Sequence, residues 1–250
     1  MSVELFLAIS SGVVALASAV LSSRSSRGQA LLSARLQEQA EARSRDEARE
    51  DVMSRYRDPL LWAAFDLQAR VFNFARGPEA FLATYYERGT PREREYALRS
   101  TLFVFAEYLG WVEILRRRVQ FLDLGDSADN RRMVELMDAI STALNNDPGN
   151  LSFRLFRGEQ RAIGETVIAP GEGDTCIGYA EFSRRLDEDP VFAAWYAGLT
   201  ESIREFAARP TRPDRLIRLQ HALMDLIDFL DPQVERFPSH IRDRLHNEGW

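Results

Sequence analysis

Hydrophobic and polar positions follow the period of an amphipathic helix over most of this chain. In the first clear segment after the N-terminal region, the apolar positions are Leu60, Leu61, Ala64, Leu67, Val71 and Phe74. Such spacing puts one apolar stripe on a helix, and that stripe is buried against neighbouring helices. Pro- and Gly-rich breaks at 77–78, 147–150 and 210–213 separate further segments of this kind. The pattern predicts an all-α bundle.

Two helix starts carry recognisable capping signals. Asp58-Pro59 has the order of an N-cap residue followed by proline in the first turn. Thr90 and Glu93 form a capping-box pattern with Pro91 between them. The helix that follows is predicted to run to about Leu122, and between Thr101 and Leu115 its only charges are Glu107 and Glu113. We expect this to be the central helix of the bundle.

Five further helices are predicted, at 128–146, 153–165, up to Leu186, 190–208 and 213–230. The stretch 166–178 has the only β character of the chain. Its two ends, Thr166-Val167-Ile168 and Thr175-Cys176-Ile177, could pair as a small hairpin or form a plain loop. We expect one bundle domain at 58–250, with a possible internal boundary near 169–178.

An uncharged, mostly apolar run extends from Leu5 to Ser23. Nineteen residues span about 28 Å as a helix, close to the thickness of a bilayer core. We therefore predict a transmembrane anchor at 1–23. A cleaved export signal ending at Ala17-Ser18-Ala19 is an alternative, but the only side-chain charge before the run is Glu4 and not a positive one. A soluble helix is a further alternative.

The flanking charges predict the orientation of this anchor. Arg24, Arg27 and Arg35 all follow it, so the positive-inside rule places the N-terminus outside and the C-terminal domain in the cytoplasm. The single cysteine, Cys176, agrees with a reducing compartment. Small residues recur every four positions in the anchor, at Ser11, Ala15 and Ala19. This spacing would allow two anchors to pack closely in a homo-oligomer. The alternative is that a weakly apolar span simply contains small residues.

Residues 24–57 are rich in Ala, Glu, Gln and Arg and contain few large apolar side chains. These are good helix formers with no sustained heptad pattern. We expect a solvated helical stalk between the anchor and the domain.

Composition narrows the class of partner. The chain has 250 residues and a formal net charge of −6, which argues against binding nucleic acid. The mean hydropathy of the whole chain is −0.30. Outside the predicted anchor, the composition is therefore that of an ordinary soluble protein. All 32 basic residues are arginine, which a GC-rich coding genome explains most simply.

One group of charged residues suggests a ligand pocket. Three arginines are spaced to share one face of the helix predicted at 153–165, and guanidinium groups suit phosphate or carboxylate. The alternative is that these arginines pair with carboxylates inside the bundle. The candidate ligand-binding residues are Arg154, Arg157, Glu159, Arg161, Glu107 and Glu113.

Other chemistry finds weaker support. His221, Asp225 and Asp228 share a helix face and are candidate metal ligands, but the Glu-x-x-His pairs of bundle di-iron sites are missing. A wet helix face is the ordinary interpretation, and we expect no metal or cofactor. No Gly-x-Ser-x-Gly elbow occurs. A nucleophilic Cys176–His221 pair would require the fold to bring these two residues together, because they are far apart in the sequence.

The function expected from the sequence is a membrane-tethered cytoplasmic interaction module, such as an adaptor, a scaffold or a sensor subunit, without catalytic activity. Its partners would be the membrane, through residues 5–23, and one or more proteins. One alternative is a ligand-sensing or enzymatic domain with the Arg/Glu pocket described above. Another is an oligomeric membrane effector assembled through its anchor.

Overall fold

The regular secondary structure of the described residues is entirely helical, which confirms the all-α prediction. No strand occurs among them. The computed structural model describes residues 35–41, 43–44, 55–76, 81–118, 127–146, 152–171, 174–209 and 214–246.

The chain divides into two compact units, 1–52 and 53–250. In the first unit, residues 35–41 and 43–44 are helical and their side chains are exposed to solvent. Gln37 donates a hydrogen bond to Glu41 one turn later, over 3.3 Å. The predicted anchor at 5–23 lies outside the described residues. Among the described helices, none combines the length and the apolar character that a membrane span requires.

The second unit opens with a helix whose start differs from the prediction. Residues 55–75 are helical, so Asp58 and Pro59 lie inside this helix and do not open it. Contacts from distant parts of the chain stabilise the turn before Pro59. Tyr56 donates a hydrogen bond to Asp174 over 2.8 Å, and the Arg57 Nε donates to the Leu230 carbonyl over 2.8 Å. Proline is tolerated early in a helix, where few amides have an acceptor in any case.

A short π-helix, η1 (Leu82–Glu87), precedes α2 (Pro91–Arg118). The Arg88 amide bonds the Ala83 carbonyl, five residues back, over 3.2 Å, as a π-helix requires. The predicted capping box at the start of α2 is confirmed. Glu93 accepts from the Thr90 amide over 2.8 Å, and the Glu93 amide donates to the Thr90 hydroxyl over 3.3 Å.

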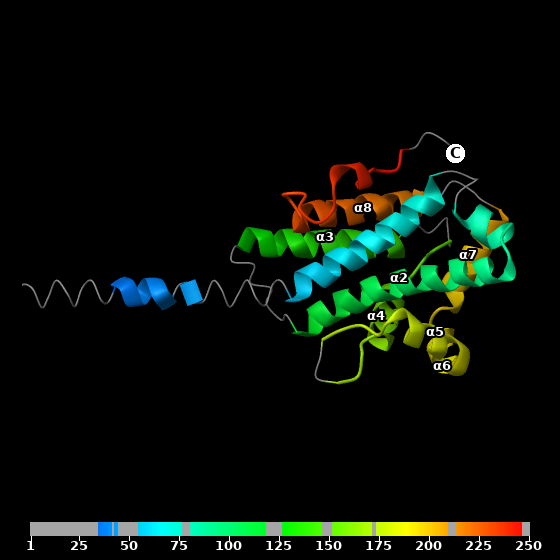
Figure 1. Cartoon of the computed structure of the whole chain (residues 1–250), viewed down its shortest axis with the longest axis horizontal. Helices are drawn as coiled ribbons and strands as arrows, with labels where there is room; N and C mark the ends of the chain where they lie inside the picture. Colours follow the sequence, from blue (N-terminus) through cyan, green and yellow to red (C-terminus); the bar gives the residue numbers. More distant parts are fainter. Residues whose placement is uncertain are drawn as a thin grey trace, which may run out of the picture. The chain divides into compact units, whose positions relative to one another are not determined.

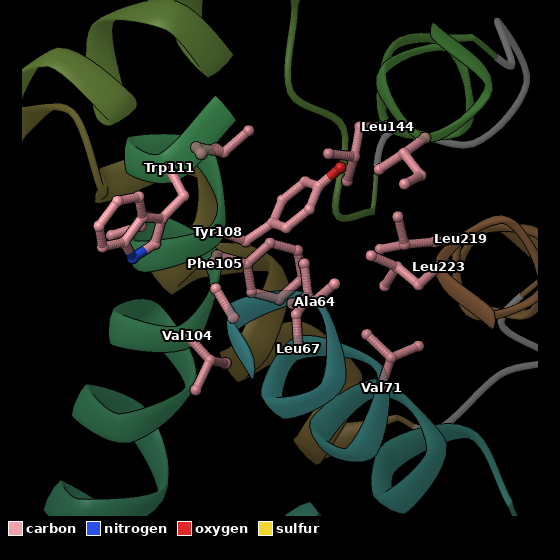
Figure 2. Close-up of a cluster of buried hydrophobic side chains, with 14 of the residues drawn as sticks. Ala64, Leu67, Val71, Val104, Phe105, Tyr108, Trp111, Leu144, Leu219 and Leu223 are labelled. Atoms are coloured by element: carbon pink, nitrogen blue, oxygen red, sulfur yellow. The ribbon is translucent and has the colours of Figure 1, made fainter. Parts of the chain in front are cut away.

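The main core lies between α2, residues 55–75, α3 (Ser127–Asn145) and α8 (Asp214–Leu230). Figure 2 shows Phe105 and Tyr108 of α2 pointing into the space between these helices. Both side chains are almost completely buried, so α2 is the central helix that the sequence predicts. The apolar residues that meet them from the other three helices include Ala64, Leu67, Val71, Leu144, Leu219 and Leu223.

The remaining helices, α4 (Arg157–Thr166), α5 (Tyr179–Glu188), α6 (Pro190–Ala194) and α7 (Ala197–Ala208), complete the unit. α4, α5 and α7 all contact α2, while α3 packs against α8 (Figure 1). α4 begins at Arg157 and not at Phe153, so that part of the helix prediction is wrong. Phe153 has a positive φ of 56° and its ring is buried in the core, which the helical backbone would not allow.

The helix predicted at 190–208 is in fact two helices, α6 and α7, separated at Trp195 and Tyr196. The amides of both residues bond to carbonyls three residues back, which tightens the chain into a turn. The buried Tyr196 ring explains the break, because in this position it packs edge-on against Phe182 at 5.1 Å and beside Phe192 at 5.0 Å.

Between α4 and α5 the chain reverses, as the hairpin interpretation expected, but the described residues of this stretch form a single antiparallel bridge, between Ile168 and Cys176. The Ala169 amide donates to Thr175 over 2.9 Å, and the Ile177 amide donates to Val167 over 2.8 Å. The stretch is therefore a loop with a single bridge in its described part, and no strand develops.

Glycine permits the close crossing of α2 and α4. A methyl group on Gly164 would lie 2.4 Å from the Leu109 carbonyl oxygen, and one on Gly110 would lie 2.6 Å from the Cys176 sulfur. Both distances are shorter than van der Waals contact allows, so these two positions hold α2, α4 and the bridged loop in register.

The C-terminal segment after α8 folds back along that helix (Figure 1). Asp231 accepts hydrogen bonds from the amides of Glu235, Arg236 and Phe237, over 2.9, 3.1 and 3.1 Å, and pairs with Arg242. The Phe237 ring then stacks on Phe65 with centroids 3.9 Å apart. A buried carboxylate and an aromatic contact thus help to fix this segment to the helices.

Candidate ligand-binding groove

The predicted arginine stripe is not formed, because Arg154 precedes α4 and is not helical. Its Nε donates to the Asn145 carbonyl over 3.2 Å, and its guanidinium lies 4.5 Å from the Phe156 ring centroid. Arg157 forms an ion pair with Asp138 of α3 over 2.8 Å. Arg161 is exposed on α4. The three arginines therefore have different surroundings.

The glutamates predicted to line the same pocket also have separate partners. Glu159 accepts the Phe156 amide over 2.8 Å at the start of α4. Glu113 is buried and pairs with Arg116 and Arg117 on its own helix. Burial works to raise the pKa of Glu113, but hydrogen bonds from these two arginines outweigh it and lower the pKa. Glu113 thus finds its cations locally and not on α4.

Glu107 differs from the other carboxylates because no arginine neutralises it in the described structure. Burial raises its pKa to about 7, and the nearby charge of Asp66 adds to this effect. The pKa of Asp66 is itself raised by burial, while Arg70 acts in the opposite direction. Glu107 also lies beside Cys176, whose sulfur approaches the Glu107 carbonyl oxygen at 3.8 Å.

Cys176 is a poor nucleophile in this setting. Burial, and then the charge of Glu107, raise the pKa of its thiol to about 12, so the thiolate is scarce at neutral pH. His221 does not assist it, because the His221 Nε2 is 2.8 Å from the Leu245 carbonyl oxygen in the C-terminal segment. The structure does not bring the Cys176–His221 pair together.

The candidate metal ligands on α8 face arginines of the C-terminal segment. Asp225 pairs with Arg244 over 2.7 Å, and Asp228 pairs with both Arg242, over 3.0 Å, and Arg244, over 2.8 Å. In the described part of the chain, no three His, Cys, Asp or Glu side chains are grouped as a metal site would need. The pairing found on α8 is that of a charged helix face covered by a basic segment.

A large groove lies elsewhere, where residues 55–76, η1 and the first turns of α2 meet. It has a volume of about 950 Å³, near the upper end of the range for small-molecule sites. Polar and aromatic groups from all three elements line it. They are Asn73, Arg76, Phe81, Thr84, Tyr85, Thr90, Arg92, Glu93 and Tyr96.

The aromatic side of this groove is unusually exposed. Tyr85 is 41% exposed and Tyr96 is 52% exposed, although both are large rings. Phe81 stands next to Tyr85, with ring centroids 5.0 Å apart. The π-helix η1 presents Thr84 and Tyr85 to the groove while its Leu82 is buried. Short π-helical turns are frequent at functional sites.

The charged side of the groove is net positive. Arg76 and Arg92 line it, and no ion pair joins either of them to another described residue. The one carboxylate, Glu93, is occupied by the capping box, and its hydrogen bonds to the Thr90 amide and hydroxyl lower its pKa. The N-terminus of the 28-residue helix α2 adds partial positive charge at the same point.

Arg70 lies behind the groove wall. Its guanidinium carbon is 4.3 Å from the centroid of Phe81, and Tyr96 is its main electrostatic support. The Arg70 Nη1 is buried and has no hydrogen-bond partner among the described residues. Burial lowers the pKa of this guanidinium. A buried donor without an acceptor is costly, and here it adjoins two groove-lining rings.

Two other hollows are less suitable. One, of about 690 Å³, lies between α3 and α8 and includes His221 and Asp225, which already have partners in the C-terminal segment. The other, of about 260 Å³, lies between residues 65–73 and the C-terminal segment. Of the three, the groove at α2 has the largest volume, and its two arginines outnumber its single carboxylate, Glu93.

Sequence analysis did not identify this groove. It used Thr90 and Glu93 only as a helix cap. The sequence does contain a signal for this groove. Aromatic residues cluster directly before the strong helix start at Thr90, and arginines lie on both sides of them. Only the fold shows that Tyr85 and Tyr96 are exposed and line one groove with Arg76.

Comparison with known proteins adds no identity. No family model matches the chain, and no curated protein sequence or solved structure is significantly similar to it.

Proposed function

We propose that this protein is a membrane-tethered, non-catalytic binding module, of the sensor-subunit kind, whose ligand site is the groove at η1 and the start of α2. The groove with its exposed rings and its two arginines is the observation that carries this proposal. Residues 5–23 would attach the module to the membrane, with the bundle on the cytoplasmic side.

The state of the ionisable groups supports binding over catalysis. The thiol of Cys176 stays protonated at neutral pH, Glu113 and Glu159 serve local structure, and Asp225 and Asp228 are paired with arginines. A general acid or base needs a pKa near the working pH and a place for substrate next to it. Glu107 meets the first condition, but it lines none of the three hollows.

The position of η1 between two other helices also favours a sensor. η1 contacts both α2 and α7, so a ligand that orders η1 would act on two helices of the bundle at once. A ligand shifts a conformational equilibrium only through different contacts in the two states. In this proposal, the second state is one in which η1 exchanges its π-helical hydrogen bonds for α-helical ones.

The test is to locate binding on the full-length chain in detergent micelles. Two-dimensional amide NMR spectra would be recorded while a chemically diverse fragment library is screened. The proposal predicts that the shifted amides cluster at residues 81–96. Hits concentrated in the α3–α8 hollow, or turnover of a substrate by the purified chain, would overturn it.

A further inference from the structure

We propose that the ligand of this groove is a small anion that carries a flat aromatic ring, with a phosphate or a carboxylate as its charged group. This inference rests on the proposed function and gives it a ligand class. The groove supplies two kinds of contact side by side, cationic groups at the start of α2 and aromatic rings from η1 and α2.

The charged group of the ligand would lie between Arg76, Arg92 and the first turn of α2. Guanidinium groups bind phosphate and carboxylate through paired hydrogen bonds. The amide of Arg92 is in the first turn, so it has no acceptor inside its own helix. Pro91 has no amide to offer, and the Thr90 and Glu93 amides are used by the capping box.

The aromatic part of the ligand would lie against Tyr85 and Tyr96. Both rings are about half exposed, and covering them removes apolar surface from water. Offset or edge-on stacking adds to this gain. Phe81 extends the same surface, since its ring lies 5.0 Å from Tyr85.

Arg70 is the second cue for an anion. Its Nη1 is buried without a hydrogen-bond partner in the described structure, directly behind Phe81. Positive charge kept inside a protein without an acceptor favours a negative group nearby. Asp66 and Tyr96 already act on the Arg70 guanidinium, and an anion in the groove would add negative charge next to Phe81 and Tyr96, the two groove-lining rings that adjoin Arg70.

The size of the groove fits a small molecule. Its volume of about 950 Å³ exceeds what an inorganic phosphate ion fills and lies within the range of drug-sized ligands. A free inorganic anion would use only the arginine side and leave the tyrosine rings in water. The combination therefore favours one ligand that makes both contacts.

The experiment is isothermal titration of the full-length chain in detergent with four probes: naphthyl phosphate, naphthoate, inorganic phosphate and the neutral naphthalenemethanol. The inference predicts that at least one anionic ring probe binds about tenfold more tightly than both inorganic phosphate and the neutral alcohol. The two anionic ring probes together show whether phosphate or carboxylate is preferred.

Three variants sharpen the result. Arg92→Gln is expected to weaken the anionic ring probes about tenfold, and Tyr85→Leu about threefold to tenfold. Arg131→Gln changes an exposed arginine of α3 outside the groove and is the matched control, with no expected change. Equal binding of the neutral alcohol, an unchanged affinity in Arg92→Gln, or no binding of either anionic ring probe would overturn the inference.

The two proposals fail in different ways. If fragments still shift the amides of 81–96 but neutral rings bind as tightly as anionic ones, the groove remains a ligand site and only the ligand class is wrong. If fragments bind elsewhere, both proposals fail.

Discussion

Glu107 is a carboxyl group that the fold keeps partly protonated near neutral pH. Its burial, the neighbouring Asp66 and the absence of a pairing arginine in the described structure all favour the neutral form. The other acids of the bundle, such as Glu113 and Asp231, have donors or cations next to them, and their pKa values are lowered. The difference depends on local partners, since Glu107 and Glu113 lie on the same helix.

The raised pKa of Glu107 has a consequence for stability. The folded state retains a proton that the unfolded state loses between the ordinary pKa of 4.5 and about 7. The free energy of unfolding therefore falls as pH rises through this window. Glu107→Gln is expected to remove this fall and to stabilise the protein at pH 8 by on the order of 2 kcal/mol, with little effect at pH 4.

The measurement is urea unfolding of the full-length chain in detergent at several pH values. Glu201→Gln, at an exposed position of α7, is the control and should keep the fall. Parallel stability curves for the wild type and Glu107→Gln would contradict the assignment. The thiol of Cys176 does not interfere, because its pKa of about 12 lies outside this range.

At the level of elements, the crossing of α2 and α4 depends on a glycine that helix propensity alone would disfavour. Alanine usually stabilises a helix relative to glycine. At Gly164, however, the added methyl would lie 2.4 Å from the Leu109 carbonyl oxygen. Since backbone cannot move aside as a side chain does, Gly164→Ala is expected to destabilise the fold by about 2 kcal/mol.

Gly158, on the same helix, is a matched control because nothing lies within 4 Å of a methyl group placed there. Gly158→Ala is expected to leave stability unchanged or to raise it by about 0.5 kcal/mol. Chemical denaturation of both variants compares them directly. If Gly164→Ala is as stable as Gly158→Ala, the crossing is looser than described.

Local signals predicted the helices well where those signals are strong. The capping box at Thr90 and Glu93 and the helix predicted at 128–146, which is α3, both appear in the structure. Predictions failed where a distant contact decides the backbone. Phe153 leaves the helix to bury its ring, and the turn at Tyr196 splits one predicted helix into two.

The candidate site was harder to predict for a related reason. Residues such as Arg154, Arg157 and Arg161 were grouped by helical spacing, but their partners come from other elements, for example Asp138 of α3. The groove, in turn, joins Arg76 with Tyr85 and Arg92, which share no helix. The spacing of residues within one helix does not show which residues of different elements will line the same groove.

On the scale of the whole molecule, the anchor at residues 5–23 remains a prediction from the sequence. It predicts that the full-length chain sediments with membranes and is released by detergent but not by high salt. A chain without residues 1–23 should stay in the supernatant, because hydrophobic partition and not charge would hold the protein. Ultracentrifugation of cell lysates with immunodetection measures this.

Recovery of the intact full-length chain in the supernatant would contradict the anchor. It would leave the groove unaffected, because every residue of the groove belongs to the unit 53–250. Release of a shortened chain that begins after Ala19 would support the cleaved-signal alternative instead.

The central claim is that the groove at η1 and the start of α2 binds the ligand. Hydrogen–deuterium exchange of the full-length chain, with and without saturating naphthyl phosphate, tests it most directly. The account predicts slower exchange at residues 81–96 and unchanged exchange in α3 and α8. Protection confined to α3 and α8, or no protection at 81–96 when the probe is bound, would contradict it.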